Sequence, residues 1–201
     1  MIIWINGAFG AGKTTVACEL ERRLTGAYLY DPENIGYFLR KNTPHQCHTP
    51  DFQDTPLWRS FNYEALKMIA GNYPGTIIVP MTLVNRTYYE EIIGKLQVDG
   101  IEVKHFILYA SRKTILKRLR MRNLGLSILR RESFAISAIP RCLDFFDHQV
   151  TEIKLQTDKM SVDEVVEAVA AQSGLILRPD SRSKVQNIFY RLGILLDHIR
   201  R

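Results

Sequence analysis

The chain has 201 residues, 46% of them hydrophobic and 24% charged, which is typical of one globular domain with a full core. Its three cysteines are too few and too scattered for a disulfide framework, and we expect free thiols. The first residues run straight into a glycine loop, and no apolar run approaches the roughly 20 residues that span a bilayer. We therefore expect a cytoplasmic protein.

The formal net charge of +6 is unevenly distributed. Residues 111–141 carry nine Lys or Arg and one Glu, and residues 181–201 carry five Lys or Arg and one Asp. A general nucleic-acid-binding protein spreads positive charge over a groove-sized face, so this distribution argues against a nucleic-acid partner. It suggests a phosphate clamp in the first segment and a surface contact in the second.

The first part of the chain alternates strand and helix. Residues 2–5 are an apolar run, and residues 14–24 have apolar side chains at four-residue spacing, which predicts a buried strand and then a helix. Residues 27–30 form a second strand. The sequence Asp-Pro-Glu at residues 31–33 then opens a helix that runs to residue 40, with an N-cap acid and proline at the first position.

The middle of the chain begins with residues 42–56, a polar loop with three prolines that is long enough to suggest a function. A helix is expected at residues 56–70 and a strand, buried on both faces, at residues 76–79. Apolar spacing predicts another helix around residues 89–96. A fourth strand follows at residues 102–109.

The last part begins with a basic helix at residues 111–122. Residues 123–148 are expected to be helical and mobile, followed by a strand at 153–156 and a helix at 161–171. The chain finishes with a helix from about residue 181 to 199.

This alternation predicts an α/β domain, with a parallel sheet covered by helices on both faces. We assign residues 1–178 to this domain, with a lid at about 123–141. We assign residues 179–201 to a C-terminal amphipathic helix appended to it.

Residues 7–14 match the phosphate-loop pattern G-x-x-x-x-G-K-[ST] between a strand and a helix. The glycines let the backbone turn tightly, and the N–H groups and helix dipole favour a bound anion. Lys13 is expected to reach the β- and γ-phosphates of ATP, and the Thr14 hydroxyl to ligate Mg²⁺. The predicted nucleotide site comprises Gly7, Ala8, Phe9, Gly10, Ala11, Gly12, Lys13, Thr14 and Thr15.

The acceptor side of the site is expected at the carboxyl ends of the strands. Asp31 follows the second strand and is our candidate for the general base or the anchor of an acceptor hydroxyl. Asp before Pro is also an ordinary helix cap, and both roles can coexist. Glu33 and Arg40, on the same helix, are further candidates for acceptor binding.

The helix after the long loop starts with aromatic and polar side chains suited to an acceptor pocket. Core packing is the alternative for Trp58. The candidates are Trp58, Arg59, Asn62 and Thr82, with Asp51, Phe52 and Gln53 from the loop.

No Asp or Glu ends the third strand, at residues 76–81, where a Walker-B carboxylate is usual. Either Asp31 and waters complete the Mg²⁺ shell, or the metal is held less firmly.

The basic helix suggests an arginine lid. Arg118 and Arg122 are four residues apart and share one face, and arginine suits phosphate because its fork is planar and always charged. Three more arginines follow, Arg130, Arg131 and Arg141. A lid that closes over the γ-phosphate would neutralise charge in the transition state. A solvated basic helix is the alternative, and the loop 156–159 is expected to hold the adenine.

The last helix has one apolar stripe among basic residues. This pattern favours a helix packed on the domain, and a helix lying on an anionic membrane surface is the alternative. The apolar residues are Val185, Ile188, Phe189, Leu192, Leu195, Leu196 and Ile199.

Together with the phosphate loop, four motifs resemble those of bacterial tunicamycin-resistance proteins: residues 30–33 (YDPE), 51–58 (DFQDTPLW), 78–82 (IVPMT) and 116–120 (LKRLR). These are small P-loop kinase-like proteins related to nucleoside-monophosphate kinases, shikimate kinase and chloramphenicol phosphotransferase. The resemblance implies a P-loop NTPase fold, a five-stranded parallel sheet of order 2-3-1-4-5 with a lid, and ATP binding. It also implies protection against tunicamycin, a nucleoside antibiotic with sugars and a fatty acyl chain, with Asp31 meeting the acceptor hydroxyl.

Two functions follow from these predictions. The first is transfer of a phosphoryl group from ATP to a hydroxyl of tunicamycin or a similar nucleoside-sugar. The second is ATP-dependent binding of the drug without turnover, with peripheral membrane contact through residues 181–201. The sequence leaves the oligomeric state open.

Overall fold

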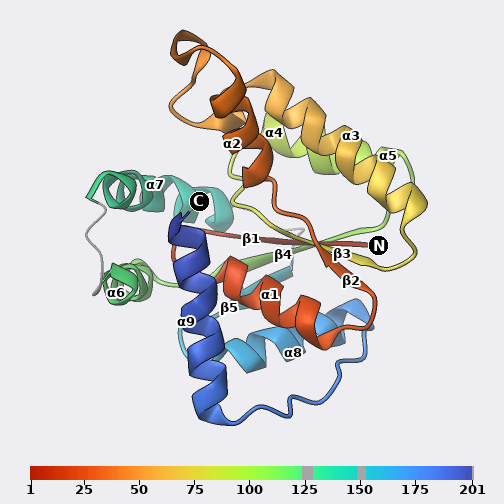
Figure 1. Cartoon of the computed structure of the whole chain (residues 1–201), viewed down its shortest axis with the longest axis vertical. Coiled ribbons are helices and arrows are strands. Elements are labelled where there is room, and N and C mark those ends of the chain that lie inside the picture. Colours follow the sequence, from red (N-terminus) through yellow and green to blue (C-terminus); the bar gives the residue numbers. More distant parts are fainter. Residues whose placement is uncertain (124–128, 149–152, 201) are drawn as a thin grey trace.

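The computed structural model describes residues 1–123, 129–148 and 153–200, except for the side chains of residues 122–134, 184, 188 and 195–200. One sheet contains five parallel strands in the order β2-β3-β1-β4-β5 (Figure 1). This confirms the predicted order. The strands are β1 (Ile2–Gly7), β2 (Ala27–Leu29), β3 (Thr76–Pro80), β4 (Val103–Tyr109) and β5 (Ile153–Gln156).

Helices cover both faces of the sheet, as the alternating pattern predicts (Figure 1). The helices are α1 (Lys13–Arg23), α2 (Glu33–Asn42), α3 (Pro56–Asn72), α4 (Arg86–Tyr89), α5 (Lys95–Val98), α6 (Arg112–Asn123), α7 (Leu129–Asp147), α8 (Val162–Ser173) and α9 (Lys184–Arg200). A π-helical turn, η3 (Glu90–Gly94), joins α4 to α5. The long loop contains two 3-10 turns, η1 (His45–Cys47) and η2 (Phe52–Asp54).

The central strand β1 is buried along its whole length, which explains its unbroken apolar sequence. On one face it packs with α1 and α8, through residues such as Leu20 and Val166. On the other face it packs with α3 and η3, where Trp4 contacts the cluster that contains Trp58 and Ile92. A third cluster joins α6 and α7 to the start of the phosphate loop. The phosphate loop is thereby enclosed by elements distant in sequence.

The C-terminal helix is attached to α1 by charged groups. Glu19 is fully buried, and its carboxylate accepts hydrogen bonds from Arg22, Arg182 and Arg191. Arg191 also pairs with Asp163 at the start of α8. The described part of α9 therefore docks on the domain through Arg191, and the segment just before the helix docks through Arg182.

Three residues of the predicted apolar stripe lie in the described part of this helix and are exposed. Val185, Phe189 and Leu192 are 59%, 69% and 48% exposed. Within the described chain, no helix is both long enough and apolar enough to cross a membrane. Cys18, Cys47 and Cys142 are free thiols, as expected.

Candidate functional site

The phosphate loop is shaped by its glycines. Gly7 has φ 151°, and a Cβ there would lie 2.8 Å from the carbonyl oxygen of Leu108. Gly12, with φ 99°, is the N-cap of α1. These positions admit only glycine without strain, because side chains rarely adopt this region and β4 leaves no space at Gly7. The N–H groups at the start of α1 can then face an anion.

Lys13 lies folded over this loop. Its Nζ donates to the carbonyl oxygens of Gly7, at 3.0 Å, and Ala8, at 3.2 Å, and lies 5.4 Å from the centre of the Phe9 ring. The ammonium group is therefore already within the loop that is predicted to hold phosphate. To reach a bound β- or γ-phosphate it exchanges these carbonyl oxygens for phosphate oxygens.

A buried asparagine, which the sequence reasoning missed, fixes the loop to the sheet. The Oδ1 atom of Asn6 accepts from the N–H groups of Gly7, at 2.8 Å, and Leu83, at 2.9 Å. Its Nδ2 donates to the Leu83 carbonyl oxygen at 2.8 Å. A polar side chain at the end of an otherwise apolar strand was the signal available for this role.

Thr82 stands just beyond β3, near the usual place of a Walker-B acid. Its hydroxyl donates to the carbonyl oxygen of Gly7 at 2.9 Å, so it braces the phosphate loop. Its own carbonyl oxygen accepts from Nε2 of Gln53 at 3.0 Å. Thr82 thus connects the phosphate loop with the long loop that precedes α3, which we call the acceptor loop (residues 43–55).

The residues of the phosphate loop fit Mg²⁺ bound together with a nucleotide. Among the described residues, no group of three or more His, Cys, Asp or Glu side chains could hold a metal by itself. Mg²⁺ commonly keeps several waters and takes one or two protein groups plus phosphate oxygens. Thr14 supplies a hydroxyl of the required type.

Helix α2 begins at Glu33 with Pro32 as its N-cap, one residue later than predicted, and Asp31 lies just before it at the carboxyl edge of the sheet. Its Oδ1 accepts from the N–H of Glu33 at 3.0 Å. Glu33 accepts from the Tyr37 hydroxyl at 3.0 Å. Arg40 donates to the carbonyl oxygen of Pro50 at 3.0 Å and so supports the acceptor loop. The catalytic and acceptor-binding roles of these residues stay predictions.

Three predicted pocket residues have their polar groups engaged inside the protein. Trp58 is fully buried and donates to the Pro32 carbonyl oxygen at 3.0 Å. Asn62 is also fully buried and accepts from the Tyr30 hydroxyl at 2.8 Å. Arg59 pairs with Glu91 and donates to the carbonyl oxygen of Gln53 at 2.6 Å. These side chains lie behind the acceptor loop, and their direct contact with an acceptor stays a prediction.

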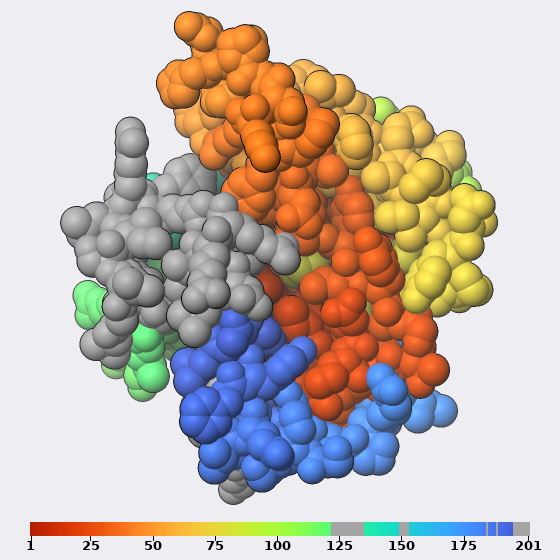
Figure 2. Space-filling view, viewed as in Figure 1, coloured from red at the N-terminus to blue at the C-terminus, as the bar shows by residue number. Residues whose placement is uncertain are grey.

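Figure 2 shows the surface hollowed between the orange segment that contains α2 and the red segment that contains α1. This recess lies between the helix that follows the phosphate loop and the helix that follows Asp31. A nucleotide and an acceptor approaching from the two sides would meet there.

Arg118 clamps two loops together. It donates to the carbonyl oxygen of Ala11 at 3.3 Å, to Oγ1 of Thr157 at 3.2 Å and to the carbonyl oxygen of Thr157 at 2.6 Å. Burial lowers the pKa of its guanidinium. Its fork is directed at the loop predicted to hold the adenine, so a role at the γ-phosphate requires that it leave these partners. The side chains of Arg122, Arg130 and Arg131 are outside the described residues.

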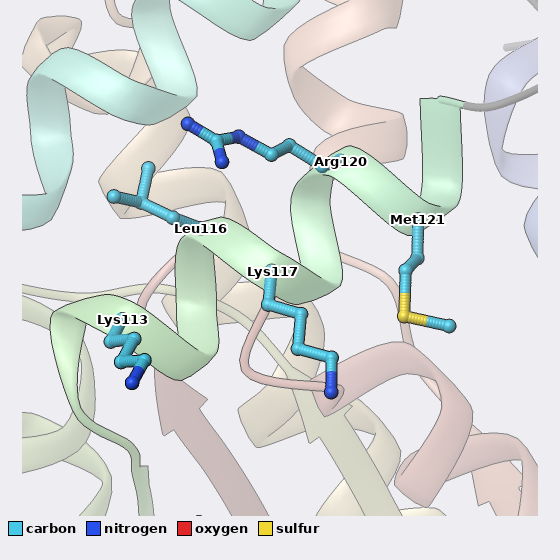
Figure 3. A pocket seen from close by; sticks show the side chains of 5 residues that line it. All are labelled: Lys113, Leu116, Lys117, Arg120 and Met121. Atoms are coloured by element: carbon cyan, nitrogen blue, oxygen red, sulfur yellow. The ribbon is translucent and has the colours of Figure 1, made fainter.

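The outer surface of α6 carries a shallow hollow (Figure 3). Its lining combines three cations with two apolar side chains, Lys113, Leu116, Lys117, Arg120 and Met121. Figure 3 shows Lys117 and Met121 extending to one side of the helix and Leu116 and Arg120 to the other. Because all five residues come from one helix, the hollow is distinct from the recess beside the phosphate loop.

A parallel sheet of this order, with a phosphate loop after its central strand, defines the class of the protein as a small P-loop kinase fold. Solved structures with this fold include the APS kinase of Mycobacterium tuberculosis (18% identity, TM-score 0.58, 86% of this chain and 96% of that chain). Thymidylate kinase from Candida albicans is also similar (17% identity, TM-score 0.56, 90% and 95%).

The tunicamycin resistance protein of Deinococcus radiodurans is considerably more similar. It is 30% identical with a TM-score of 0.73, over 89% of this chain and 99% of that chain. The chain therefore belongs to the tunicamycin-resistance protein family. No family model matches it, and no curated protein does.

Proposed function

We propose that the protein is an ATP- and Mg²⁺-dependent phosphotransferase that acts on a hydroxyl of tunicamycin or a similar nucleoside-sugar. The phosphate loop from Gly7 to Thr15 would bind ATP, with Lys13 on the β- and γ-phosphates and Thr14 on the metal. Bound Mg²⁺ would neutralise charge on the phosphates during transfer. Arg118 would close the nucleotide side, and Asp31 would be the anchor or the general base of the acceptor hydroxyl.

One observation carries this proposal beyond nucleotide binding. Nε2 of Gln53 donates to the carbonyl oxygen of Thr82, and the Thr82 hydroxyl donates to the carbonyl oxygen of Gly7. This Gly7 oxygen also accepts from Nζ of Lys13. The acceptor loop is thus joined to the phosphate loop by two consecutive buried hydrogen-bonded contacts. Such a connection sets the distance between two bound reactants, and a transferase depends on this distance whereas a simple nucleotide-binding module does not.

The test is mass spectrometry of tunicamycin incubated with the protein and Mg-ATP, with Lys13→Ala as the control. We expect a mass gain of about 80 Da, one phosphoryl group, that is absent in the control. Fragmentation would then locate the modified hydroxyl. No gain, with ATP and drug both bound, would contradict phosphotransfer to this drug.

The alternative is ATP-dependent binding of the drug without turnover. It is favoured by the threonine that stands where a Walker-B acid is usual, and by the outward apolar stripe of Val185, Phe189 and Leu192. An outward apolar stripe suits peripheral contact with a membrane, where an acylated drug would also concentrate. This function predicts protection in proportion to the amount of protein, unmodified drug, and loss of vesicle binding when all three residues are changed to serine.

A further inference from the structure

The acceptor loop holds a second carboxylate in a fixed position. Asp51 precedes the turn η2, and the backbone around it is supported from two helices. Arg40 of α2 donates to the carbonyl oxygen of Pro50 at 3.0 Å, and Arg59 of α3 donates to that of Gln53 at 2.6 Å. A side chain on such a backbone can serve a reaction, because its geometry does not have to be established anew in each cycle.

The two oxygen atoms of Asp51 have different surroundings. Oδ1 accepts from the N–H of Gln53 at 3.0 Å and so caps the turn. Oδ2 lies 3.8 Å from Nη2 of Arg141, beyond hydrogen-bonding distance. The Asp51 side chain is only 16% exposed, whereas that of Arg141 is 61% exposed. Oδ2 can therefore still accept a hydrogen bond from a bound hydroxyl while a cation lies beside it.

This pair lies beside the phosphate loop. Cys142, the neighbour of Arg141 on α7, belongs to the same buried cluster as Ala8. Burial raises the pKa of the Cys142 thiol, while the charges of Lys13 and Arg141 lower it and that of Asp51 raises it further. The acceptor loop itself reaches the phosphate loop two residues after Asp51, where Gln53 donates to the carbonyl oxygen of Thr82 and the Thr82 hydroxyl donates to that of Gly7.

We propose that Asp51 is the carboxylate that takes the proton of the acceptor hydroxyl, and that Arg141 meets the phosphoryl group as it is transferred. This inference rests on the proposed phosphotransfer and divides the work between two carboxylates. Asp31 holds the acceptor in place. Asp51 removes the proton.

In this step the acceptor O–H proton passes to Oδ2 of Asp51. The acceptor oxygen forms a bond to the γ-phosphorus, and the bond between that phosphorus and the β–γ bridging oxygen breaks. ADP leaves with the electron pair. During the transfer Arg141 stabilises the charge on the equatorial oxygens of the phosphoryl group. Arg118 could do this only after leaving its hydrogen-bond partners Ala11 and Thr157.

The electrostatics of Asp51 suit a proton acceptor. Burial raises its pKa and the nearby Asp54 adds to this, against the Gln53 N–H, Arg141 and Arg40, which lower it. The net effect is a raised pKa, and a carboxylate with a raised pKa holds a transferred proton more firmly. The group must be ionised to act, so activity should fall on acidification at a higher pH than for an ordinary aspartate.

The experiment compares Asp51→Asn with Asp54→Asn, a matched control in the same turn. Asp54 accepts from the Tyr88 hydroxyl at 2.8 Å and has no part in the proposed site. Asparagine at position 51 can still accept from Gln53, so the turn and the fold should persist. We expect kcat for product formation to fall by about 10²–10⁴-fold in Asp51→Asn. ATP affinity and thermal stability should be unchanged. Asp54→Asn should keep kcat near the wild-type value at neutral pH, with the acid limb moved to lower pH because the charge of Asp54 no longer raises the pKa of Asp51.

The pH profile adds a result that loss of structure would not give. Removing the cation in Arg141→Gln should raise the pKa of Asp51 and move the acid limb of kcat to higher pH, whereas Asp51→Asn should abolish this limb. If the wild-type protein forms product and the kcat of Asp51→Asn is within about twofold of the wild-type kcat, the role of Asp51 is overturned and the proposed function stands. Absence of any phosphorylated product from the wild-type protein would instead overturn the proposed function, and this role with it.

Discussion

The phosphate loop and the acceptor loop face each other but are built from different parts of the chain. The phosphate loop consists of backbone, with glycines at the turns and one buried asparagine behind it. The acceptor loop is held by side chains of the helices on either side of it, Arg40 and Arg59, and by its own Gln53, which donates to Thr82. A phosphate is the same in every nucleotide and can be held by N–H groups, whereas an acceptor is particular to each enzyme. The backbone-built phosphate loop is therefore the general part of the site, and the acceptor loop, held by side chains, is the specific part.

The largest expected effect comes from changing the phosphate loop, the part of the site that is general to nucleotides. Lys13→Ala removes the cation that is placed to bind the β- and γ-phosphates. We expect product formation to fall by about 10³-fold or more, with weaker ATP binding, because little else in the loop supplies a full positive charge. Lys67→Ala, on the outer side of α3, is the control. If the two variants bind ATP equally well, the phosphate loop does not work as described.

Changing the acceptor side should separate binding of ATP from turnover. Asp31→Asn should retain ATP affinity, because Asp31 is outside the phosphate loop, and lose product formation by about 10²–10³-fold. Asparagine can still accept from the N–H of Glu33 at the start of α2, so the protein should fold. Isothermal titration with ATP and a product assay measure the two effects separately, and unchanged turnover would remove Asp31 from the reaction.

Breaking the link between the two loops should have a milder effect on product formation. Gln53→Ala leaves the buried Thr82 carbonyl oxygen without its side-chain donor, at a cost of about 1–3 kcal/mol in stability. We expect the KM for the acceptor to rise by about 10-fold at nearly constant ATP affinity, because the acceptor loop loses its position relative to the phosphate loop. Asn72→Ala, which removes an exposed amide at the end of α3, is the control. An equal loss of ATP affinity would show that the two loops are not separable.

The smallest effect on catalysis is expected far from both loops, at Glu19. Burial alone would raise the pKa of this carboxyl, but hydrogen bonds from Arg182, Arg22 and Arg191 outweigh burial and lower it. A lowered pKa stabilises the fold above the ordinary carboxylate pKa, and this stability is lost as the pH falls through the folded-state pKa. Glu19→Gln should cost about 1–3 kcal/mol, less than for fully buried pairs because the arginines are partly exposed.

Thermal melting between pH 7 and pH 3 measures this effect. The difference in stability between wild type and Glu19→Gln should shrink toward the acid end, with kcat at neutral pH little changed. A difference that is constant with pH would mean that the charge of Glu19 is not what holds the C-terminal helix.

The sequence predicted the position of the phosphate loop between a strand and a helix, but not the contacts that hold the acceptor loop, for a physical reason. Glycine spacing and apolar runs are local signals, so the loop at residues 7–14 and the strand positions can be read directly. The role of Arg59 depends on Glu91, 32 residues away, and that of Gln53 on Thr82, 29 residues away. Nothing in the spacing of the chain indicates these pairs.

The same reasoning explains Arg118 and the long loop. A basic helix shows where positive charge is, but the carbonyl oxygens that Arg118 contacts come from two other loops and carry no signature in the side-chain sequence. Of the two 3-10 turns within residues 42–56, η2 is capped by the Asp51 side chain and η1 has no side-chain cap. Capping by Asp is a common local signal that does not distinguish a turn from an irregular loop.

Helix α1 begins at Lys13 and carries Glu19 six residues further on, about 9 Å along its axis. One helix thus starts in the predicted phosphate loop and holds Arg182 and Arg191 through a buried anion in its middle. To release α9, the protein must expose or neutralise this anion on the same helix that positions the lysine. If release of α9 changes the affinity of the phosphate loop for its ligand, the ligand must change the docking of α9 by the same factor.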